Sequence, residues 1–379
     1  MNKFERIAHA LLTTTSKTVP ASNLPRPLVR SRDDFYGPPD FGDIPIEEWL
    51  DLLNSNSSSS SSSNNSNNDN VDNDDGIERK NNNNARQLLF GHRFLKGQLT
   101  TEEARTIGFR EQTHRPELVE RTVLEVAGTV LTAQLALKHG IAANLAGGTH
   151  HAHPEGGAGY TILNDLAIAT DLLTKAYASS SSSSGAALND CGDDDDDPTA
   201  SGGNTNRVVV DRVLVIDCDV HQGDGTAQYS TLWDESDDRR DRLFTLSIHC
   251  ESNYPFQKHN STYDVGLPDR CNDKDYLAAL EKSVNKAIAE VDPHLVLYDA
   301  GVDVYKHDKL GRLDLSEEGG IRRRDRWVLD RCVSLGIPVA AVVGGGYDKE
   351  SIDALGRRHA IVHEECAYVW RKHKMWLRQ

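Results

Sequence analysis

The sequence predicts an α/β fold, a single three-layer domain in which a mostly parallel sheet is flanked by helices. Short apolar runs rich in β-branched residues alternate with longer helix-like segments along much of the 379-residue chain, as expected for parallel strands buried on both faces. Several of these runs end in a polar or glycine-rich turn. Because the carboxyl ends of parallel strands meet at one edge of a sheet, we expect a ligand site there.

The expected elements follow one another in a regular order. One late helix begins after Asp273 or Asp275 as its cap, and the next is capped by Ser316. Strands are predicted at Ala142–Ala146, Val213–Asp219, Leu243–His249, Leu295–Asp299 and Val339–Val343, and helices at Pro116–His139, Ile162–Tyr177, Gly225–Leu232, Tyr276–Val291, Ser316–Leu335 and Ser351–Lys372.

Composition excludes several classes of function. The chain has 42 basic and 58 acidic residues, a net charge of -16, and no basic patch suited to phosphates, which argues against direct nucleic-acid binding. No apolar run reaches transmembrane length, so we expect no membrane partner. The 6 cysteines are not in CxxC spacing and are typical of reduced, mostly buried thiols in an intracellular protein.

Two low-complexity segments interrupt the chain. Residues 54–85 are nearly all Ser, Asn and Asp, and residues 178–206 combine a Ser run, an Asp run and a Gly/Asn stretch. Neither can bury enough apolar surface to offset ordering, so both are predicted to be disordered, the second as an insertion within the domain at 86–379. Residues 1–32 are basic and rich in Ser and Thr, as in a transit peptide or an ordinary basic tail. We expect the nucleus or cytoplasm, or a mitochondrion or plastid if the segment is a transit peptide.

The most informative segment ends the strand at 213–219. Asp217, Asp219 and His221 alternate there, so they share one face. Three ionisable groups are costly to desolvate at a buried strand end unless something pairs with them, and a divalent metal would do so. Asp219 and His221 have Cα atoms about 6.6 Å apart on a strand, which suits two ligands of one ion. Asp217 is expected to support a histidine or a structural cation instead.

The remaining ligand must come from another strand end, and Asp303 is the best placed by type. Two Asp and one His leave a coordination position open for water, as in catalytic zinc sites. Bound Zn²⁺ can lower the pKa of its water to about 7.

Adjacent histidines follow a Gly-Gly turn at His150 and His151. A histidine beside an activated water can act as general base and then as general acid. Asp217 and Asp224 are available to fix the imidazole tautomers. Tyr347, after three glycines, could donate its phenol proton to a carbonyl oxygen as charge builds there.

Together these residues resemble the histone deacetylase superfamily, the zinc-dependent amidohydrolases of the arginase/deacetylase fold, and most closely its bacterial-type and class IV-like members. The resemblance covers about residues 95–372. The matching segments are Ala146–His151, Gly157–Tyr160 leading into Asn164–Asp165, Asp217–Gly225, Ser247–His249, Gly301–Asp303 and Gly344–Tyr347.

The resemblance implies a role for each matched position. The implied zinc ligands are Asp219, His221 and Asp303, with Fe²⁺ as the alternative metal. The implied proton-transfer and carbonyl-polarising residues are His151 oriented by Asp224, His150 paired with Asp217, and Tyr347. The implied substrate contacts are Gly159, Tyr160, Tyr254 and Phe256, and the implied structural potassium site uses Asp217, Asp219, His221 and Ser247.

The implied function is removal of acetyl or other acyl groups from lysine side chains of histones or other proteins. Alternatives are a deacetylase of small acylated amines or polyamines, an arginase-like ureohydrolase with two manganese ions, and a catalytically silent scaffold that works through its low-complexity insertions. Two departures from the family matter. Tyr160 stands where many members have Phe, and residues 1–53 match the usual first strand and tunnel-rim loop poorly. We expect His249 and His259 to be structural or surface histidines.

Overall fold

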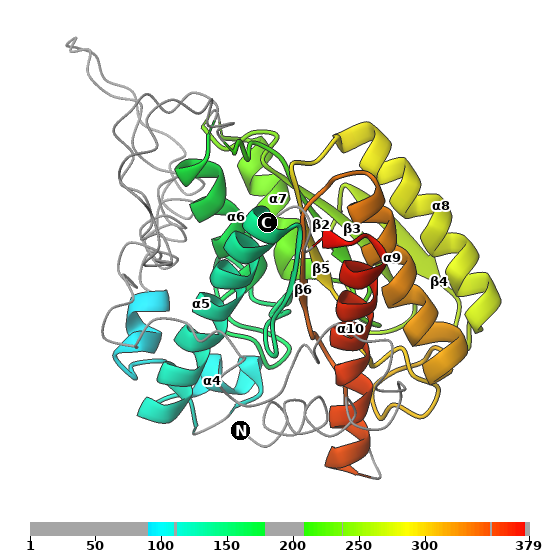
Figure 1. Cartoon of the computed structure of the whole chain (residues 1–379). Coiled ribbons are helices and arrows are strands. Elements are labelled where there is room, and N and C mark those ends of the chain that lie inside the picture. Colours follow the sequence, from blue (N-terminus) through cyan, green and yellow to red (C-terminus); the bar gives the residue numbers. More distant parts are fainter. Residues whose placement is uncertain (1–89, 110–111, 179–207, 237, 349–350, 376–379) are drawn as a thin grey trace, which may run out of the picture.

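The computed structural model describes residues 90–109, 112–178, 208–236, 238–348 and 351–375 (Figure 1). The predicted N-terminal region at 1–53 and the tract at 54–85 lie outside these residues, as does the insertion at 178–206 except for residue 178. The five described cysteines are free and buried. No helix among the described residues is long and apolar enough to cross a membrane.

A single six-stranded sheet forms the centre of the domain, and every neighbouring pair of its strands is parallel. This confirms the predicted three-layer α/β fold. The strands are β1 (Ile141–Ala143), β2 (Val213–Asp217), β3 (Leu243–Cys250), β4 (Tyr263–Leu267), β5 (Leu295–Asp299) and β6 (Val339–Val342), in the spatial order β1-β6-β5-β2-β3-β4.

Helices cover both faces of the sheet. They are α4 (Thr101–Ile107), α5 (Pro116–His139), α6 (Asp165–Ala176), α7 (Asp224–Asp234), α8 (Asp273–Val291), α9 (Arg322–Ser334) and α10 (Ile352–Lys372), with a π-helical turn at Glu317–Ile321 before α9. Figure 1 shows α5 and α6 on one side of the sheet and α8, α9 and α10 on the other.

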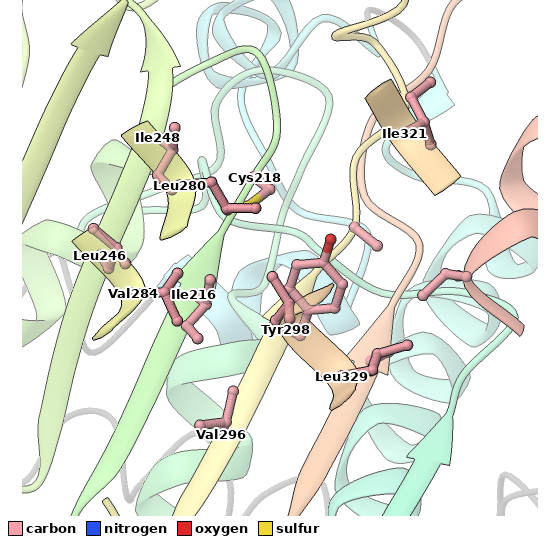
Figure 2. Close-up of a cluster of buried hydrophobic side chains, with 14 of the residues drawn as sticks. Ile216, Cys218, Leu246, Ile248, Leu280, Val284, Val296, Tyr298, Ile321 and Leu329 are labelled. Atoms are coloured by element: carbon pink, nitrogen blue, oxygen red, sulfur yellow. The ribbon is translucent and has the colours of Figure 1, made fainter. Parts of the chain in front are cut away.

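Side chains of successive strand residues enter two different cores, which explains the continuous apolar runs. In β2, Val213 and Val215 belong to the core on the α5 and α6 side. Leu214 and Ile216 belong to the core on the α8 and α9 side. Figure 2 shows this second core, where Ile216 lies among side chains of β3, β5, α8 and α9.

The structure differs from the predicted elements in a few places. The helix predicted at 276–291 begins at Asp273, and its cap is Asn272, whose side chain accepts from the Asp275 backbone N–H. The prediction of Asp273 or Asp275 as the cap was therefore wrong. Asp273 accepts hydrogen bonds from the backbone N–H and hydroxyl of Ser316 instead. Ser316 does cap the turn before α9, as predicted.

Helix α4 and strand β4 were not predicted. α4 is short, although Thr100 and Glu103 form a capping box at its start. β4 lies at the edge of the sheet and exposes Asp264 and Gly266, so it lacks the apolar run that marks the central strands. The predicted strands at 142–146 and 213–219 are also shorter, because β1 ends at Ala143 and β2 ends at Asp217. Asp219 therefore lies in the turn after β2 and not on the strand.

The strand order determines where in the sheet a ligand site is expected. After β2 the chain adds β3 and β4 on one side, and then returns to place β5 and β6 on the other side of β2. The carboxyl ends of β2 and β5 therefore flank the point where the connections change direction. Open α/β sheets bind their ligands at such a point.

Candidate metal centre and active site

Loops after four different strands bring the predicted site residues together. Asp219 and His221 follow β2, Asp303 follows β5, and Tyr347 follows β6. The His150–His151 pair lies in the loop between β1 and α6. The two histidine rings of this pair lie 4.1 Å apart, and the His151 ring lies 5.8 Å from that of His221.

Asp219, His221 and Asp303 form a buried group with the geometry of metal ligands. The Nδ1 atom of His221 lies 2.9 Å from Asp219 Oδ1 and 3.2 Å from Asp303 Oδ2. Ligand atoms on a tetrahedral ion with bonds of about 2.1 Å are about 3.4 Å apart. Within the described residues, Asp303 Oδ2 has no hydrogen-bond partner. These three residues therefore fit a metal ion.

The pKa shifts of His221 and Asp303 also support a metal site. Burial opposes the His221 imidazolium, but the nearby Asp219 and Asp303 carboxylates raise its pKa to about 10. Burial and the Asp219 charge raise the pKa of Asp303 to about 7. Both shifts are those expected where two carboxylates are buried close together without a compensating cation. A divalent cation would supply the missing positive charge and displace the protons.

Gly345 leaves room for the two carboxylates. A Cβ atom at this position would overlap both Asp219 Oδ2 and Asp303 Oδ2, closer than real Cβ contacts come. The backbone N–H of Gly345 also donates to Asp219 Oδ2 at 2.8 Å. The glycine run before Tyr347 thus brings the backbone against the ligand group, which a larger residue would displace.

Each histidine of the pair has its own carboxylate. His150 Nδ1 lies 2.7 Å from Asp217 Oδ2, and His151 Nδ1 lies 2.5 Å from Asp224 Oδ1. Both contacts fix the imidazole through Nδ1, which leaves Nε2 as the second functional atom of each ring. Asp217 and Asp224 are the two carboxylates that the sequence analysis named as available to fix the imidazole tautomers.

The two histidines are driven to opposite protonation states. Burial disfavours the His150 cation, but Asp217 and Asp219 outweigh it and hold its pKa well above the usual value. Burial and the neighbouring His150 lower the pKa of His151 to about 4, although Asp224 acts against them. At neutral pH, His150 is therefore the charged member and His151 the neutral one. A neutral imidazole beside a cationic one is suited to accept a proton.

A second group of potential ligands was not foreseen. His150, Asp217 and Asp299 also place ligand atoms close together, because Asp217 and Asp299 are register partners on β2 and β5. Asp299 Oδ2 lies 4.0 Å from His150 Nδ1. Burial and the Asp217 charge raise the pKa of Asp299 well above its usual range. A metal count per chain distinguishes one ion from two at this edge.

The predicted substrate contacts divide into two pairs. Gly159 and Tyr254 lie against His151: a Cβ at Gly159 would meet its ring at 2.5 Å, and the Tyr254 ring lies 5.0 Å away. The Tyr160 ring instead packs near Phe109 at 6.2 Å and is 56% exposed. Phe256 is 86% exposed. The structure thus places Tyr160 and Phe256 at the surface.

The residues named for a potassium site also lie close together. Ser247 is buried and is the register partner of Asp217. Its hydroxyl lies 3.0 Å from His249 Nδ1, so His249 is a buried structural histidine, as expected. His259 is half-buried.

Asp308 was missed by the sequence reasoning. One of its carboxylate oxygens accepts from the backbone N–H groups of Leu310 and Gly311, and the other accepts from that of Tyr347 at 2.7 Å. Lys309 N–H in turn donates to the Tyr347 carbonyl at 2.9 Å. This loop therefore grips the Tyr347 backbone from both sides. A lone Asp in a loop gives no sequence pattern from which such a role could be found.

Arg324 was also missed. It is fully buried and donates to the carbonyl oxygens of three residues that precede the candidate metal ligands, namely Cys218, Ala300 and Gly301. Its charge is balanced by Asp325 at 2.8 Å. The side chain ties the loop after β2 to the loop after β5. In the sequence it lies within a run of arginines, where nothing marks the buried one.

Comparison with known proteins identifies similar sequences and a matching family model. The model of the histone deacetylase domain matches residues 47–181 and 204–361. An uncharacterized protein of Picosynechococcus sp. is 41% identical over 73% of this chain and 78% of its own length. Histone deacetylase 2 of Arabidopsis thaliana is 30% identical over 62% of this chain, and the match spans 52% of that protein.

A solved structure with a similar chain is an acetylpolyamine aminohydrolase from Burkholderia pseudomallei. It is 19% identical, with a TM-score of 0.47, over 68% of this chain and 64% of that one.

Proposed function

The chain belongs to the histone deacetylase family and is a hydrolase acting on amide bonds, and on this premise we propose that it removes acyl groups from lysine side chains of histones or other proteins with a bound zinc ion. One observation carries the proposal. The buried Asp219–His221–Asp303 group lies beside a neutral, carboxylate-oriented His151. Those are the parts that hydrolysis by an activated water requires.

Asp219, His221 and Asp303 would hold the metal. One imidazole and two carboxylates suit zinc and leave a position open, as in catalytic sites. When bound there, zinc would activate water and polarise the acyl carbonyl as a Lewis acid.

His151 would move the proton. With its Nδ1 held by Asp224, its Nε2 is the atom that takes the proton from the attacking water and later passes it to the leaving amine. His150 stays cationic on Asp217 and helps to stabilise negative charge in the transition state. Burial and the charges of the ligand carboxylates hold the pKa of Tyr347 well above its usual value. Its hydroxyl therefore keeps the proton that it would donate to the developing oxyanion.

The same edge of the sheet supports a proposal of a structural potassium ion. Asp217 and Ser247 are buried register partners there, and oxygen ligands of this kind suit a hard cation.

The test is a metal count and an activity panel on the purified full chain. We expect one zinc per chain and turnover of acetyl-lysine peptides that is lost with a chelator and restored by zinc. The panel includes other acyl-lysine peptides and acetylated polyamines. Turnover of polyamines alone would replace the lysine proposal with the small-amine alternative. Two manganese ions per chain would favour a ureohydrolase, and no turnover with zinc loaded would favour a scaffold.

Replacing Asp308 by asparagine is expected to lower kcat by roughly 10-fold with little change in KM. Asparagine can keep the bonds from Leu310 and Gly311, but its NH₂ group cannot accept the Tyr347 N–H. Loss of that bond loosens the Tyr347 backbone, and small misplacements of catalytic groups cost this much or more. Steady-state kinetics on an acetyl-lysine peptide measure the effect. A change confined to KM would contradict a role in holding Tyr347.

A further inference from the structure

His153 shares a carboxylate with the proposed general base. Its Nε2 atom lies 3.1 Å from Asp224 Oδ2, while His151 Nδ1 lies 2.5 Å from the other oxygen of the same carboxylate. Asp224 is buried, whereas His153 is half-buried at the outer side of the pair. The three side chains thus form a row that runs from the proposed active site toward the surface.

The contacts of His153 determine its protonation state. Its Nδ1 atom lies 2.7 Å from Gln228 Oε1, and the Gln228 NH₂ group donates to Glu155. The amide is therefore oriented with its oxygen toward His153, so Nδ1 must carry a proton. Nε2 faces a carboxylate oxygen, which accepts only, so it must carry a proton as well. These two contacts suit the imidazolium form; burial opposes the cation, but the contact with Asp224 raises the pKa of His153 above its usual value.

The backbone keeps this ring in place. His153 N–H donates to the Gly156 carbonyl at 2.9 Å, and Gly156 N–H donates back to the His153 carbonyl at 3.2 Å. This tight turn fixes the ring between helix α7 and the segment before β4. The titratable groups that face it are Asp224 from α7, Glu155 from its own turn, and His259, whose ring lies 5.5 Å away.

We propose that His153 is a positioning residue that shares the Asp224 carboxylate with His151. As an imidazolium, His153 offsets the negative charge of Asp224, so that Asp224 can orient the His151 ring while that ring stays neutral. The inference rests on the proposed function, in which His151 must be neutral to act as a base.

The consequence follows from the sign of the charges. An isolated Asp224 carboxylate would stabilise the His151 cation and raise the pKa of that ring. The cationic His153 on the other oxygen compensates the carboxylate, which weakens this effect. Removal of the His153 charge is therefore expected to raise the pKa of His151. Because the base must be neutral, the acid limb of kcat/KM would move to higher pH.

The experiment compares two variants of the zinc-loaded full chain. His153→Gln can still donate to Asp224 but carries no charge, and His153→Phe removes both the hydrogen bond and the charge. We expect the acid limb to move up by about one pH unit in both, at the low end of what a nearby charge produces. The kcat on the plateau should fall more in His153→Phe, because Asp224 then loses a hydrogen bond that holds it.

Histidine NMR gives a readout that does not need turnover. The His151 ring should titrate at higher pH in His153→Gln than in the unchanged protein. His259→Gln is the matched control, because that ring contacts His153 without a hydrogen bond to Asp224, and it should leave both the limb and the titration in place.

Two outcomes would overturn the proposal. One is an unchanged His151 titration in His153→Gln, and the other is a uniform loss of activity across pH with no movement of the acid limb. Either result would make His153 a structural residue only. If the unchanged protein shows no turnover, the proposed function fails, while the NMR titration still decides whether His153 controls His151.

Discussion

Replacing Asp303 by asparagine is expected to abolish zinc binding and turnover without weakening the fold. The Asn oxygen can still accept the Val220 N–H that Asp303 Oδ1 accepts at 2.8 Å. Its neutral NH₂ group, however, would stand where Oδ2 faces His221 and the open ligand position. Loss of a residue that only supports a ligand costs about 10–100-fold in metal affinity, so loss of a ligand should cost more than 100-fold.

The stability of the metal-free variant gives the sharper test. Burial and repulsion from Asp219 raise the pKa of Asp303, which means that its charge is unfavourable in the folded protein. Asparagine removes this charge, so the metal-free melting temperature should stay the same or rise. Zinc raises the melting temperature of the unchanged protein by binding its folded state, and this increase should disappear in the variant.

Calorimetric titration with zinc and thermal unfolding with and without the metal measure both effects. Asp314→Asn is the matched control, since it makes the same change at a half-buried carboxylate outside the ligand group. A variant that still binds zinc as tightly as the unchanged protein would show that Asp303 is not a ligand.

The strand ends were the predictable part of the molecule. Val213 to Ile216 form a continuous apolar run because alternate side chains enter different cores, and this run predicts a central parallel strand. The residues after it must then lie at the ligand-binding edge. Strand spacing was the basis for pairing Asp219 with His221, but β2 ends at Asp217. Both residues lie in the turn after the strand, so the pairing was correct although its geometric basis was not.

Residues that act through loop contacts were not predictable. Asp308 reaches Tyr347 across 39 positions, and Arg324 reaches Cys218 across 106. Such contacts depend on how two loops approach each other, and a single sequence contains no periodicity that reports it. His153 is an intermediate case. It lies in the same histidine-rich turn as His150 and His151, but its carboxylate partner, Asp224, was already assigned to His151.

The edge strand β4 and the cap of α8 were not predicted correctly, for a different reason. Among the described strands, β4 pairs only with β3, and alternate residues such as Asp264 are exposed, which breaks the apolar run. The Asn272 cap was overlooked because two aspartates follow it, and any of the three could accept the N–H groups at the helix start. Only the packing of Asp273 against Ser316 removes that residue from the choice.

Replacing Tyr347 by phenylalanine is expected to lower kcat by about 10²–10³-fold and to leave KM nearly unchanged. A donor that acts on charge developing in the transition state contributes this much to the rate and little to binding of the ground state. The ring and the backbone bonds to Asp308 and Lys309 do not involve the hydroxyl, so the fold and the metal site should be preserved.

Tyr254→Phe is the control that isolates the role of the Tyr347 hydroxyl. Both tyrosine rings lie near the His221 ring, with centroids at 6.4 Å for Tyr347 and 6.2 Å for Tyr254, so the two variants make the same change on rings at similar distances from this candidate ligand. Only Tyr347 sits on the loop held by Asp308, and only its loss should reduce kcat by more than about 10-fold, as expected for an oxyanion donor. Equal effects in the two variants would mean that polarity of the pocket matters rather than a directed proton donor. The measurements are steady-state kinetics together with the zinc content of each variant, because a lower metal content in Tyr347→Phe would assign the loss to the metal site instead.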